Sequence, residues 1–234
     1  MSQRVVVTGA NRGLGLELAR QYAARGDEVW GGCRRPDEAK ELGELTDHVL
    51  ELDMASEASI ESFAAELRDA PLDVLINNAG VDGRALGVPD AERDVLQLST
   101  EDFLGEFRVN ALGPMLLTRA LLEPLQQADG ARIVNMSSTV GSMEVAATVG
   151  RDIGYVVSKA ALNMITVKLA GRLRDDGIIA VALHPGLLRT ALGTPRGDLQ
   201  DPAPAAAEIV ALIDSLTQAQ SGSFLHRDGS THPW

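Results

Sequence analysis

Cysteine, aromatic residues and positive charge are all scarce in this chain of 234 residues. Its single cysteine, Cys33, cannot form an internal disulfide, so nothing indicates an oxidising compartment. Aromatic residues make up 3%, which leaves no stacking platform for nucleic-acid bases. With 21 Lys and Arg against 33 Asp and Glu, the net charge of -12 argues against binding to a phosphate backbone. We expect no nucleic-acid partner.

Long apolar runs and metal-ligand spacings are also lacking. The N-terminal run that ends at Val7 is too short for the core of a signal peptide, and we expect no stretch of about 18 apolar residues that would span a membrane. The four histidines and one cysteine show no metal-binding spacing. We therefore expect a soluble, cytoplasmic protein with no membrane partner and no metal.

What the chain does have is an alternation of short β-branched runs with segments of helical period, which is typical of βαβ units around a parallel sheet. We predict a single α/β domain over residues 1–234, a Rossmann-type doubly wound parallel sheet of about seven strands with helices on both faces. The expected strands are Arg4–Thr8, Glu28–Cys33, Val49–Asp53, Val74–Asn77, Arg132–Ser137, Ile178–His184 and Ser223–His226. The expected helices are Leu14–Ala24, Pro36–Leu45, Ser56–Arg68, Thr100–Gln127 with a break at Pro114, Tyr155–Arg174 and Ala205–Leu216.

A glycine-rich turn, Thr8-Gly9-Ala10-Asn11-Arg12-Gly13-Leu14-Gly15, joins the first strand to the first helix. Glycines let the backbone turn sharply and approach a ligand, and the start of a helix attracts phosphate. This context favours nucleotide binding. A tight turn with a purely structural role is the alternative.

Arginines rather than an acidic residue follow the second strand. An acidic residue there would hold the ribose 2′-hydroxyl of NAD, whereas a guanidinium suits a 2′-phosphate. Arg34, Arg35 and Arg12 therefore favour NADP(H). A solvated loop would also account for the first two.

Three further side chains can carry chemistry. Tyr155 and Lys159 lie four positions apart on one face of a predicted helix, so an ammonium group can favour the phenolate. Ser138 follows the fifth strand, where ligands of such sheets bind. A tyrosine four residues before a lysine is also found in helices where both residues are structural. The spacing therefore indicates a catalytic pair only together with the other motifs of the chain.

Taken together, these motifs resemble those of the short-chain dehydrogenases/reductases over essentially the whole chain. The end of the sequence is similar to the branch that holds the C-factor signalling proteins and the sniffer-type carbonyl reductases. The motifs that carry the resemblance are Thr8-Gly9-x-x-x-Gly13-x-Gly15, Asp53, Asn77-Asn78-Ala79-Gly80, Asn110, Ser138, Tyr155-x-x-x-Lys159 and Pro185-Gly186-x-x-x-Thr190.

The resemblance implies a role for each catalytic position. Tyr155 would be the general acid in carbonyl reduction, and the base in alcohol oxidation. Lys159 would lower the pKa of the tyrosine and hold the nicotinamide ribose. Ser138 would bind the substrate oxygen, whereas Ser137 would be structural. Asn110 would position a water that connects Lys159 to solvent.

The resemblance also implies an NADP(H) site. Asp53 and Met54 would meet the adenine, and residues 78–80 would pass the adenosine ribose. Residues 185–190 would close over the nicotinamide, followed by a mobile substrate lid at 191–204. The expected cofactor residues are Gly9, Asn11, Arg12, Gly13, Leu14, Gly15, Arg34, Asp53, Met54, Asn78, Ala79, Gly80, Tyr155, Lys159, Pro185, Gly186 and Thr190.

One departure from the family lies between Ser138 and Tyr155, which are 17 positions apart, wider than the usual spacing. Residues 142–152 are therefore expected to form a longer loop beside the site. Within that loop Met143, Val145 and Val149 either line an apolar pocket or pack the loop down.

The expected function is NADPH-dependent reduction of the carbonyl group of a small, fairly apolar molecule, or oxidation of the alcohol. A signalling or regulatory protein that needs no turnover is the alternative from another class, and an NAD-linked alcohol dehydrogenase is a third possibility. A homo-oligomer, either a dimer or a tetramer, is compatible with the sequence.

Overall fold

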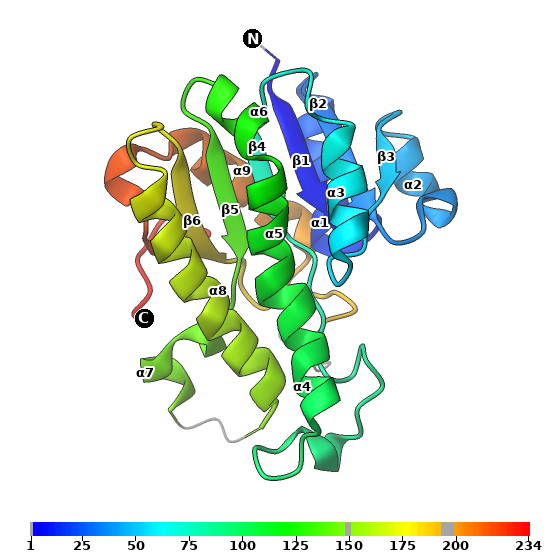
Figure 1. Ribbon diagram of the computed structural model, residues 1–234, viewed down its shortest axis with the longest axis vertical. Coiled ribbons are helices and arrows are strands. Elements are labelled where there is room, and N and C mark those ends of the chain that lie inside the picture. The colour runs from blue at the N-terminus through cyan, green and yellow to red at the C-terminus, as the bar shows by residue number, and fades with distance from the viewer. Residues whose placement is uncertain (1, 148–150, 193–198) are drawn as a thin grey trace.

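A seven-stranded parallel sheet forms the centre of the protein (Figure 1). The computed structural model describes residues 2–147, 151–192 and 199–234. The strand order is β3-β2-β1-β4-β5-β6-β7, which confirms the predicted fold class. The strands are β1 (Arg4–Thr8), β2 (Glu28–Cys33), β3 (Val49–Glu51), β4 (Val74–Asn77), β5 (Arg132–Met136), β6 (Ile179–His184) and β7 (Phe224–His226). Three strands have the predicted bounds, and the others end or begin within two residues of them.

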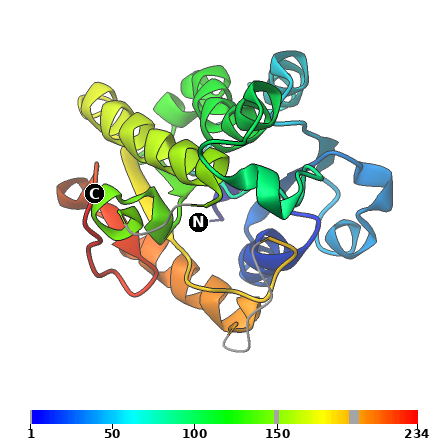
Figure 2. The ribbon, with the colours of Figure 1, turned by 90° about the horizontal axis from the view of Figure 1, so that it is seen from below.

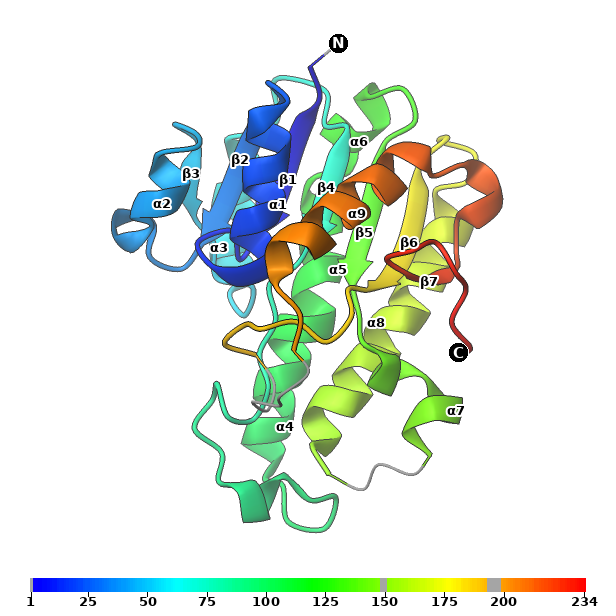
Figure 3. The same ribbon diagram turned by 180° about the vertical axis from the view of Figure 1, so that it is seen from behind.

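Helices cover both faces of the sheet. Figure 1 shows α3, α5 and α8 on one face, and Figure 3 shows α1 and α9 on the other. Each face has its own hydrophobic core. In chain order the helices are α1 (Gly13–Ala24), α2 (Lys40–Gly43), α3 (Glu57–Ala65), α4 (Thr100–Phe107), α5 (Gly113–Ala120), α6 (Leu122–Gln127), α7 (Met143–Ala146), α8 (Ile153–Arg172) and α9 (Pro202–Ser215). Because β4 follows β3 in the chain but pairs with β1, the strand order reverses at the carboxyl ends of β1 and β4, which is where ligands of such sheets bind.

Local sequence explains several element ends. Val5, Val6 and Val7 of β1 are fully buried, as expected of a central strand covered on both faces. After α1, Gly26 adopts a φ of 79°, a conformation that favours glycine and stops the helix. Ser56 accepts a hydrogen bond from the Ser59 N–H and so confirms the predicted N-cap of α3.

The helix predicted over Thr100–Gln127 is interrupted, as expected, but the interruption does not lie at Pro114. After α4 comes a π-helical turn, Arg108–Leu112, in which the Gly113 N–H bonds to the Arg108 carbonyl, five residues back. Pro114 lies in the first turn of α5, where its lack of an N–H is tolerated. The break therefore precedes the proline. A second break at Leu121 separates α5 from α6.

Other predicted bounds also need correction. The expected helix Pro36–Leu45 is a 3₁₀ turn followed by the short α2. The expected loop 142–152 contains α7, and Val149 lies outside the described residues. Of the expected lid 191–204, residues 193–198 are likewise outside, and residues 202–204 belong to α9.

Helix α8 meets the length and hydropathy criteria for a membrane span, contrary to the expectation that no stretch would. It has 20 residues, and an 18-residue window within it has a mean hydropathy of 1.2. However, it packs along β6, and its buried residues include Ser158, Lys159 and Asn163, which hydrogen-bond within the protein. Packing against the sheet accounts for its apolar character.

A buried polar ladder ties the centre of the sheet to α8. The Asn77 side-chain amide donates to Asn135 Oδ1 at 2.8 Å, and Asn135 Nδ2 donates to Thr166 Oγ1 at 2.8 Å. All three residues are at most 1% exposed. Because buried polar groups are costly when unpaired, the three residues depend on one another.

We predict that Asn135→Ala lowers the free energy of unfolding by about 2–3 kcal/mol, because the Asn77 amide keeps its burial and loses its acceptor. Urea denaturation followed by circular dichroism measures the change. Gln127→Ala, at an exposed helix end, is the control and should stay within about 0.5 kcal/mol. Equal losses in the two variants would contradict the ladder's role.

Candidate active site

The predicted site residues gather at the carboxyl end of the sheet. All strand arrows point toward this end, where α4 and α7 extend beyond the strands (Figure 1). Viewed from this end, the segment before α4, the helix α7 and the segment after β6 surround the strand ends (Figure 2). The chain thus brings together residues that are far apart in sequence.

The glycine turn has no room for side chains at two positions. A Cβ on Gly9, which has a φ of 64°, would lie 3.0 Å from Ala79 Cα, and a Cβ on Gly15 would overlap the Gly9 carbonyl. The N-cap of α1 is Arg12, and its side chain makes no capping hydrogen bond. The first N–H groups of α1 are therefore available to an anion, and the close approach needed for nucleotide binding is present.

Thr8 fastens this turn to the segment after β4. Its Oγ1 accepts hydrogen bonds from the N–H groups of Asn78 (3.0 Å) and Ala79 (2.9 Å). In the opposite direction, Asn78 Nδ2 donates to the Thr8 carbonyl at 2.9 Å. The Asn78 side chain thus holds the two loops together, a role that sequence reasoning missed.

The two arginines after β2 differ in their surroundings. Arg35 pairs with Glu38 at 3.0 Å on the surface. Within the described part of the chain, Arg34 has no hydrogen bond or ion pair and is exposed, and the same holds for Arg12. Arg34 and Arg12 can therefore both turn toward an anionic group without breaking an existing contact.

Asp53 and Met54 follow β3 as expected. The Asp53 carboxylate accepts from the Ala55 N–H at 2.9 Å, and Ser59 Oγ accepts from the Asp53 N–H at 2.9 Å. Met54 is buried against Gly113 at the start of α5. The two residues form a fixed turn at the edge of the crevice.

Ser138, Tyr155 and Lys159 meet between β5 and α8. The Ser138 side chain lies close enough to the Tyr155 hydroxyl to lower its pKa. Lys159 Nζ lies 5.6 Å from the centre of the Tyr155 ring and donates to the Met136 carbonyl at 2.7 Å. Ser137 instead donates to Asn163 Oδ1 at 2.6 Å, which confirms its structural role.

Asn110 lies beside this group, in the π-helical turn. Its Oδ1 accepts from the Val81 N–H at 2.8 Å, and its Nδ2 donates to the Val81 carbonyl and to Ser158 Oγ. A Cβ on Gly80 would lie 3.3 Å from Asn110 Oδ1 and 3.7 Å from Lys159 Nζ. The loop after β4 therefore passes close to both side chains.

Burial has the largest effect on the pKa values of Tyr155 and Lys159. It raises the pKa of Tyr155 to about 12, and Ser138 acts in the opposite direction. Burial also lowers the pKa of Lys159 to about 8. The expectation that Lys159 lowers the tyrosine pKa is not met here, because the opposing contribution comes from Ser138.

The segment after β6 reaches back to the glycine turn. Gly186 adopts a φ of 91°, and Arg227 Nη1 donates to the Pro185 carbonyl at 2.9 Å. A Cβ on Gly13 would lie 3.4 Å from Thr190 Cγ2. Thr190, the last residue of this segment, thus lies against the start of α1.

Charged residues beside Tyr155 were missed by the sequence analysis. Glu106 of α4 and Arg93 are both buried, and Arg93 forms ion pairs with Asp90 and Asp152. Asp152, at the N-cap of α8, has a φ of 57°, which is rare for a residue other than glycine. Nothing in the local sequence separates these acids from the many on the surface.

The segment before α4 holds the loop between Ser138 and Tyr155 in place. Arg151 pairs with Asp94 in an antiparallel bridge and donates to the Asp90 carbonyl at 2.9 Å. Met143 and Val145 are exposed, so neither packs the loop down. The loop forms one wall of the crevice by docking on the segment before α4.

His184 is buried at the end of β6, and its Nδ1 has no hydrogen-bond partner in the described structure. Its ring centre lies 5.5 Å from those of His226 and His232, and burial, followed by the repulsion of these neighbours, lowers its pKa to about 3. It stays neutral at physiological pH. Over the described ranges no group of His, Cys, Asp and Glu side chains is arranged to hold a metal ion.

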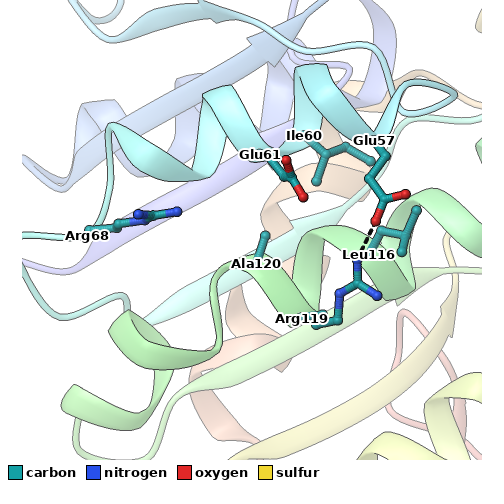
Figure 4. A pocket seen from close by; sticks show the side chains of 7 residues that line it. All are labelled: Glu57, Ile60, Glu61, Arg68, Leu116, Arg119 and Ala120. Atoms are coloured by element: carbon teal, nitrogen blue, oxygen red, sulfur yellow. Dashed lines mark hydrogen bonds and ion pairs between the residues drawn. The ribbon is translucent and has the colours of Figure 1, made fainter.

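A groove of about 350 Å³ lies elsewhere, between α3 and α5 (Figure 4). The ion pair of Glu57 and Arg119 crosses it, and Glu61 and Arg68 are also among its lining residues. It contains none of the predicted site residues. We therefore place the candidate active site at the strand ends.

Comparison with known proteins agrees with this geometry. A family model described as short chain dehydrogenase matches residues 3–200. The C-signal protein of Myxococcus xanthus is 37% identical over 176 residues, which cover 75% of this chain and all of that protein. Retinol dehydrogenase 13 of Homo sapiens is 37% identical over 82% of this chain, which spans 61% of that protein.

Two solved structures are similar over the whole chain. The NADPH-bound carbonyl reductase from chicken fatty liver has a TM-score of 0.89 and 31% identity, with 100% of this chain and 99% of that one covered. The carbonyl reductase Sniffer of D. melanogaster has a TM-score of 0.87 and 30% identity, with both chains fully covered.

We predict that Gly15→Ala weakens nucleotide binding at least tenfold, because the new Cβ overlaps the Gly9 carbonyl and displaces the turn. Titration with NADPH, followed by its fluorescence, measures the affinity. Gly171→Ala is the matched control, since a Cβ there meets nothing within 4 Å. Unchanged affinity in a folded Gly15→Ala protein would show that the turn has only a structural role.

Proposed function

The chain belongs to the short-chain dehydrogenase family, and on that premise we propose that it is an NADPH-dependent oxidoreductase. Its substrate is the carbonyl group of a small, fairly apolar molecule, or the alcohol in the reverse direction. The observation that carries the proposal is the convergence of Ser138, Tyr155 and Lys159 between β5 and α8, where Ser138 lowers the pKa of Tyr155 and the buried Lys159 Nζ lies 5.6 Å from the centre of the tyrosine ring.

The residues of this chain fit NADPH, which when bound supplies a hydride. The glycine turn leaves backbone exposed at the start of α1 for the pyrophosphate, and Thr190 lies over that turn. Arg34 and Arg12 are placed to receive a 2′-phosphate, and β2 ends without the acidic residue that suits NAD. The NADPH-bound chicken liver enzyme, with the same overall fold, supports this assignment.

Tyr155 acts as the general acid in the proposed reduction. Its hydroxyl gives a proton to the carbonyl oxygen, while Ser138 donates a hydrogen bond to that same oxygen and stabilises its developing charge. Because burial holds the tyrosine pKa near 12, the hydroxyl is fully protonated at neutral pH, as an acid must be. In the reverse direction Tyr155 takes the proton as the general base, and Ser138, which lowers its pKa, favours the phenolate.

Proton resupply runs past Asn110. An α-helical hydrogen bond to the Asn110 carbonyl would need an N–H on Pro114, which proline lacks. This carbonyl oxygen lies in the π-helical turn and is suited to hold a water near Lys159. Water, Lys159 and Tyr155 together would return the proton to the active site.

Exposed apolar side chains support a fairly apolar substrate. Leu96, Met143 and Leu187 are 85%, 80% and 49% exposed, and they lie on the three segments that surround the strand ends (Figure 2). Apolar side chains that remain in water near a site are suited to contact an apolar ligand.

A role in signalling without turnover is the second candidate. The C-signal protein, all of which is matched by this chain, favours it. The presence of Asn110, Ser138, Tyr155 and Lys159 in one place favours the enzyme, because a binding protein has no physical need for all four.

We predict that Tyr155→Phe lowers kcat for carbonyl reduction at least about 10³-fold, because the proton donor is removed, and changes NADPH affinity less than threefold. NADPH oxidation with a panel of aldehydes, ketones and quinones measures turnover. Tyr22→Phe, at a buried hydroxyl far from the strand ends, is the matched control. Tight NADPH binding without turnover on any compound would favour the signalling role.

We predict that Arg34→Ala weakens NADPH binding about tenfold and leaves NADH binding within twofold, because only the 2′-phosphate loses a partner. Arg35→Ala, whose guanidinium is already paired with Glu38, is the control. Equal changes for both nucleotides would contradict the assignment and favour an NAD-linked enzyme.

A further inference from the structure

Arg227 follows the last strand of the sheet and reaches across to the end of the neighbouring strand. β7 pairs with β6 so that His226 lies beside His184, and the next residues along the two strands are Arg227 and Pro185 (Figure 3). Arg227 Nη1 donates to the Pro185 carbonyl at 2.9 Å. The pairing of the two strands therefore places the guanidinium at the start of the segment that leaves β6.

Each nitrogen of this guanidinium has a protein partner. Nε donates to Glu208 Oε2 of α9 at 2.7 Å, and Nη2 donates to the Gln200 side chain. The Arg227 side chain is only 13% exposed, whereas that of Glu208 is 51% exposed. An ion pair with a half-exposed carboxylate adds little stability. The contacts with Pro185 and Gln200 are therefore the more important ones, and they need the planar fork of an arginine.

Gly186 leaves the space that the guanidinium occupies. A Cβ on Gly186 would lie 2.6 Å from Arg227 Nη1 and 3.3 Å from Arg227 Cζ. A side chain at this position would therefore push the guanidinium away from the Pro185 carbonyl. The glycine and the arginine thus fit each other.

The far end of the segment returns to the same guanidinium. The Gln200 N–H donates to the Leu187 carbonyl at 3.0 Å, and the Arg189 N–H donates to the Gln200 carbonyl at 2.8 Å. Between them, Leu188 is 7% exposed and belongs to the hydrophobic core on the α1 and α9 face. Arg227 therefore holds both sides of this short backbone pairing, one through Pro185 and the other through Gln200.

The segment held in this way ends against the glycine turn. Thr190 Cγ2 lies 3.4 Å from the position of a Cβ on Gly13, the first residue of α1. Within the described ranges, the hydrogen bonds and ion pairs of Arg227 go to Pro185, Gln200 and Glu208. Any effect of Arg227 on the site is therefore transmitted through the backbone of the segment.

We infer that Arg227 is a positioning residue for the proposed reaction: its fork holds residues 185–190 against the start of α1 and so sets where the nicotinamide end of NADPH can lie. The inference rests on the proposed function in taking this segment as part of the NADPH site. Arg227 acts on the position of the segment and not on a reacting group.

Amide hydrogen exchange in the protein without nucleotide measures this role directly. In Arg227→Gln the N–H groups of Arg189 and Gln200 should exchange at least about tenfold faster, because the two sides of their pairing are no longer held together. Gln200→Ala, at an exposed side chain, should accelerate exchange at Arg189 in the same direction. It serves if Arg227→Gln does not fold.

Two control variants separate the fork from an ordinary ion pair. Arg25→Gln is the matched control, because Arg25 also pairs with a carboxylate of α9, Asp214, at 2.7 Å, and it should leave the exchange unchanged. Glu208→Gln keeps the contacts with Pro185 and Gln200 and should change the exchange less than about twofold. Unchanged exchange in folded Arg227→Gln, or an equal acceleration in Glu208→Gln, overturns the inference.

Kinetics test the consequence for catalysis. In Arg227→Gln the Kd of NADPH should change less than about threefold, because the glycine turn and Arg34 are untouched. In the same variant kcat should fall at least about tenfold, since a small displacement of reacting groups is costly. A kcat equal to that of the wild type, despite faster exchange, overturns the inference.

NADPH protection separates this inference from the proposed function. If no carbonyl compound is reduced, the proposed enzyme fails, and exchange in the presence of NADPH then decides the role of Arg227. Bound NADPH should slow exchange at Arg189 and Thr190 in the wild type and slow it less in Arg227→Gln. Equal slowing in the two proteins overturns the inference whether or not turnover is found.

Discussion

The hydrogen bonds of Thr8 fix the point on which the whole site depends. One hydroxyl accepts from two successive N–H groups, those of Asn78 and Ala79, and so joins the ends of β1 and β4 where the strand order reverses. Because this join sets the path of the next residues, Gly80 lies close to both Asn110 and Lys159. The glycine turn and the loop beside Asn110 and Lys159 are therefore held by the same side chain.

Burial shifts the pKa values of the ionisable groups of the site, and each shift disfavours the charged form of the group. It raises the pKa of Tyr155 to about 12 and of Glu106 to about 7, and it lowers that of Lys159 to about 8. Each shift in pKa corresponds to a free-energy cost of burying the charged group, and favourable packing elsewhere in the sheet offsets that cost.

Features fixed by neighbouring residues could be predicted from the sequence. The valine run of β1, the glycine turn and the spacing of Tyr155 and Lys159 are local patterns, and the structure has them where they were expected. The π-helical turn could not be predicted, because Pro114 indicates a break but not its position or type. Glu106 was missed for another reason: its burial depends on Gly154, which lies 48 positions away.

Arg227 joins the two ends of the segment that follows β6. Its guanidinium binds the Pro185 carbonyl, the Gln200 side chain and Glu208 of α9, and Leu188 pairs with Gln200 beside it. The residues between Thr190 and Leu199 thus start and finish on one fixed anchor. Evolution can lengthen, shorten or replace such a segment without moving the turn at Gly186, so related proteins can acquire new substrates while the rest of the crevice stays unchanged.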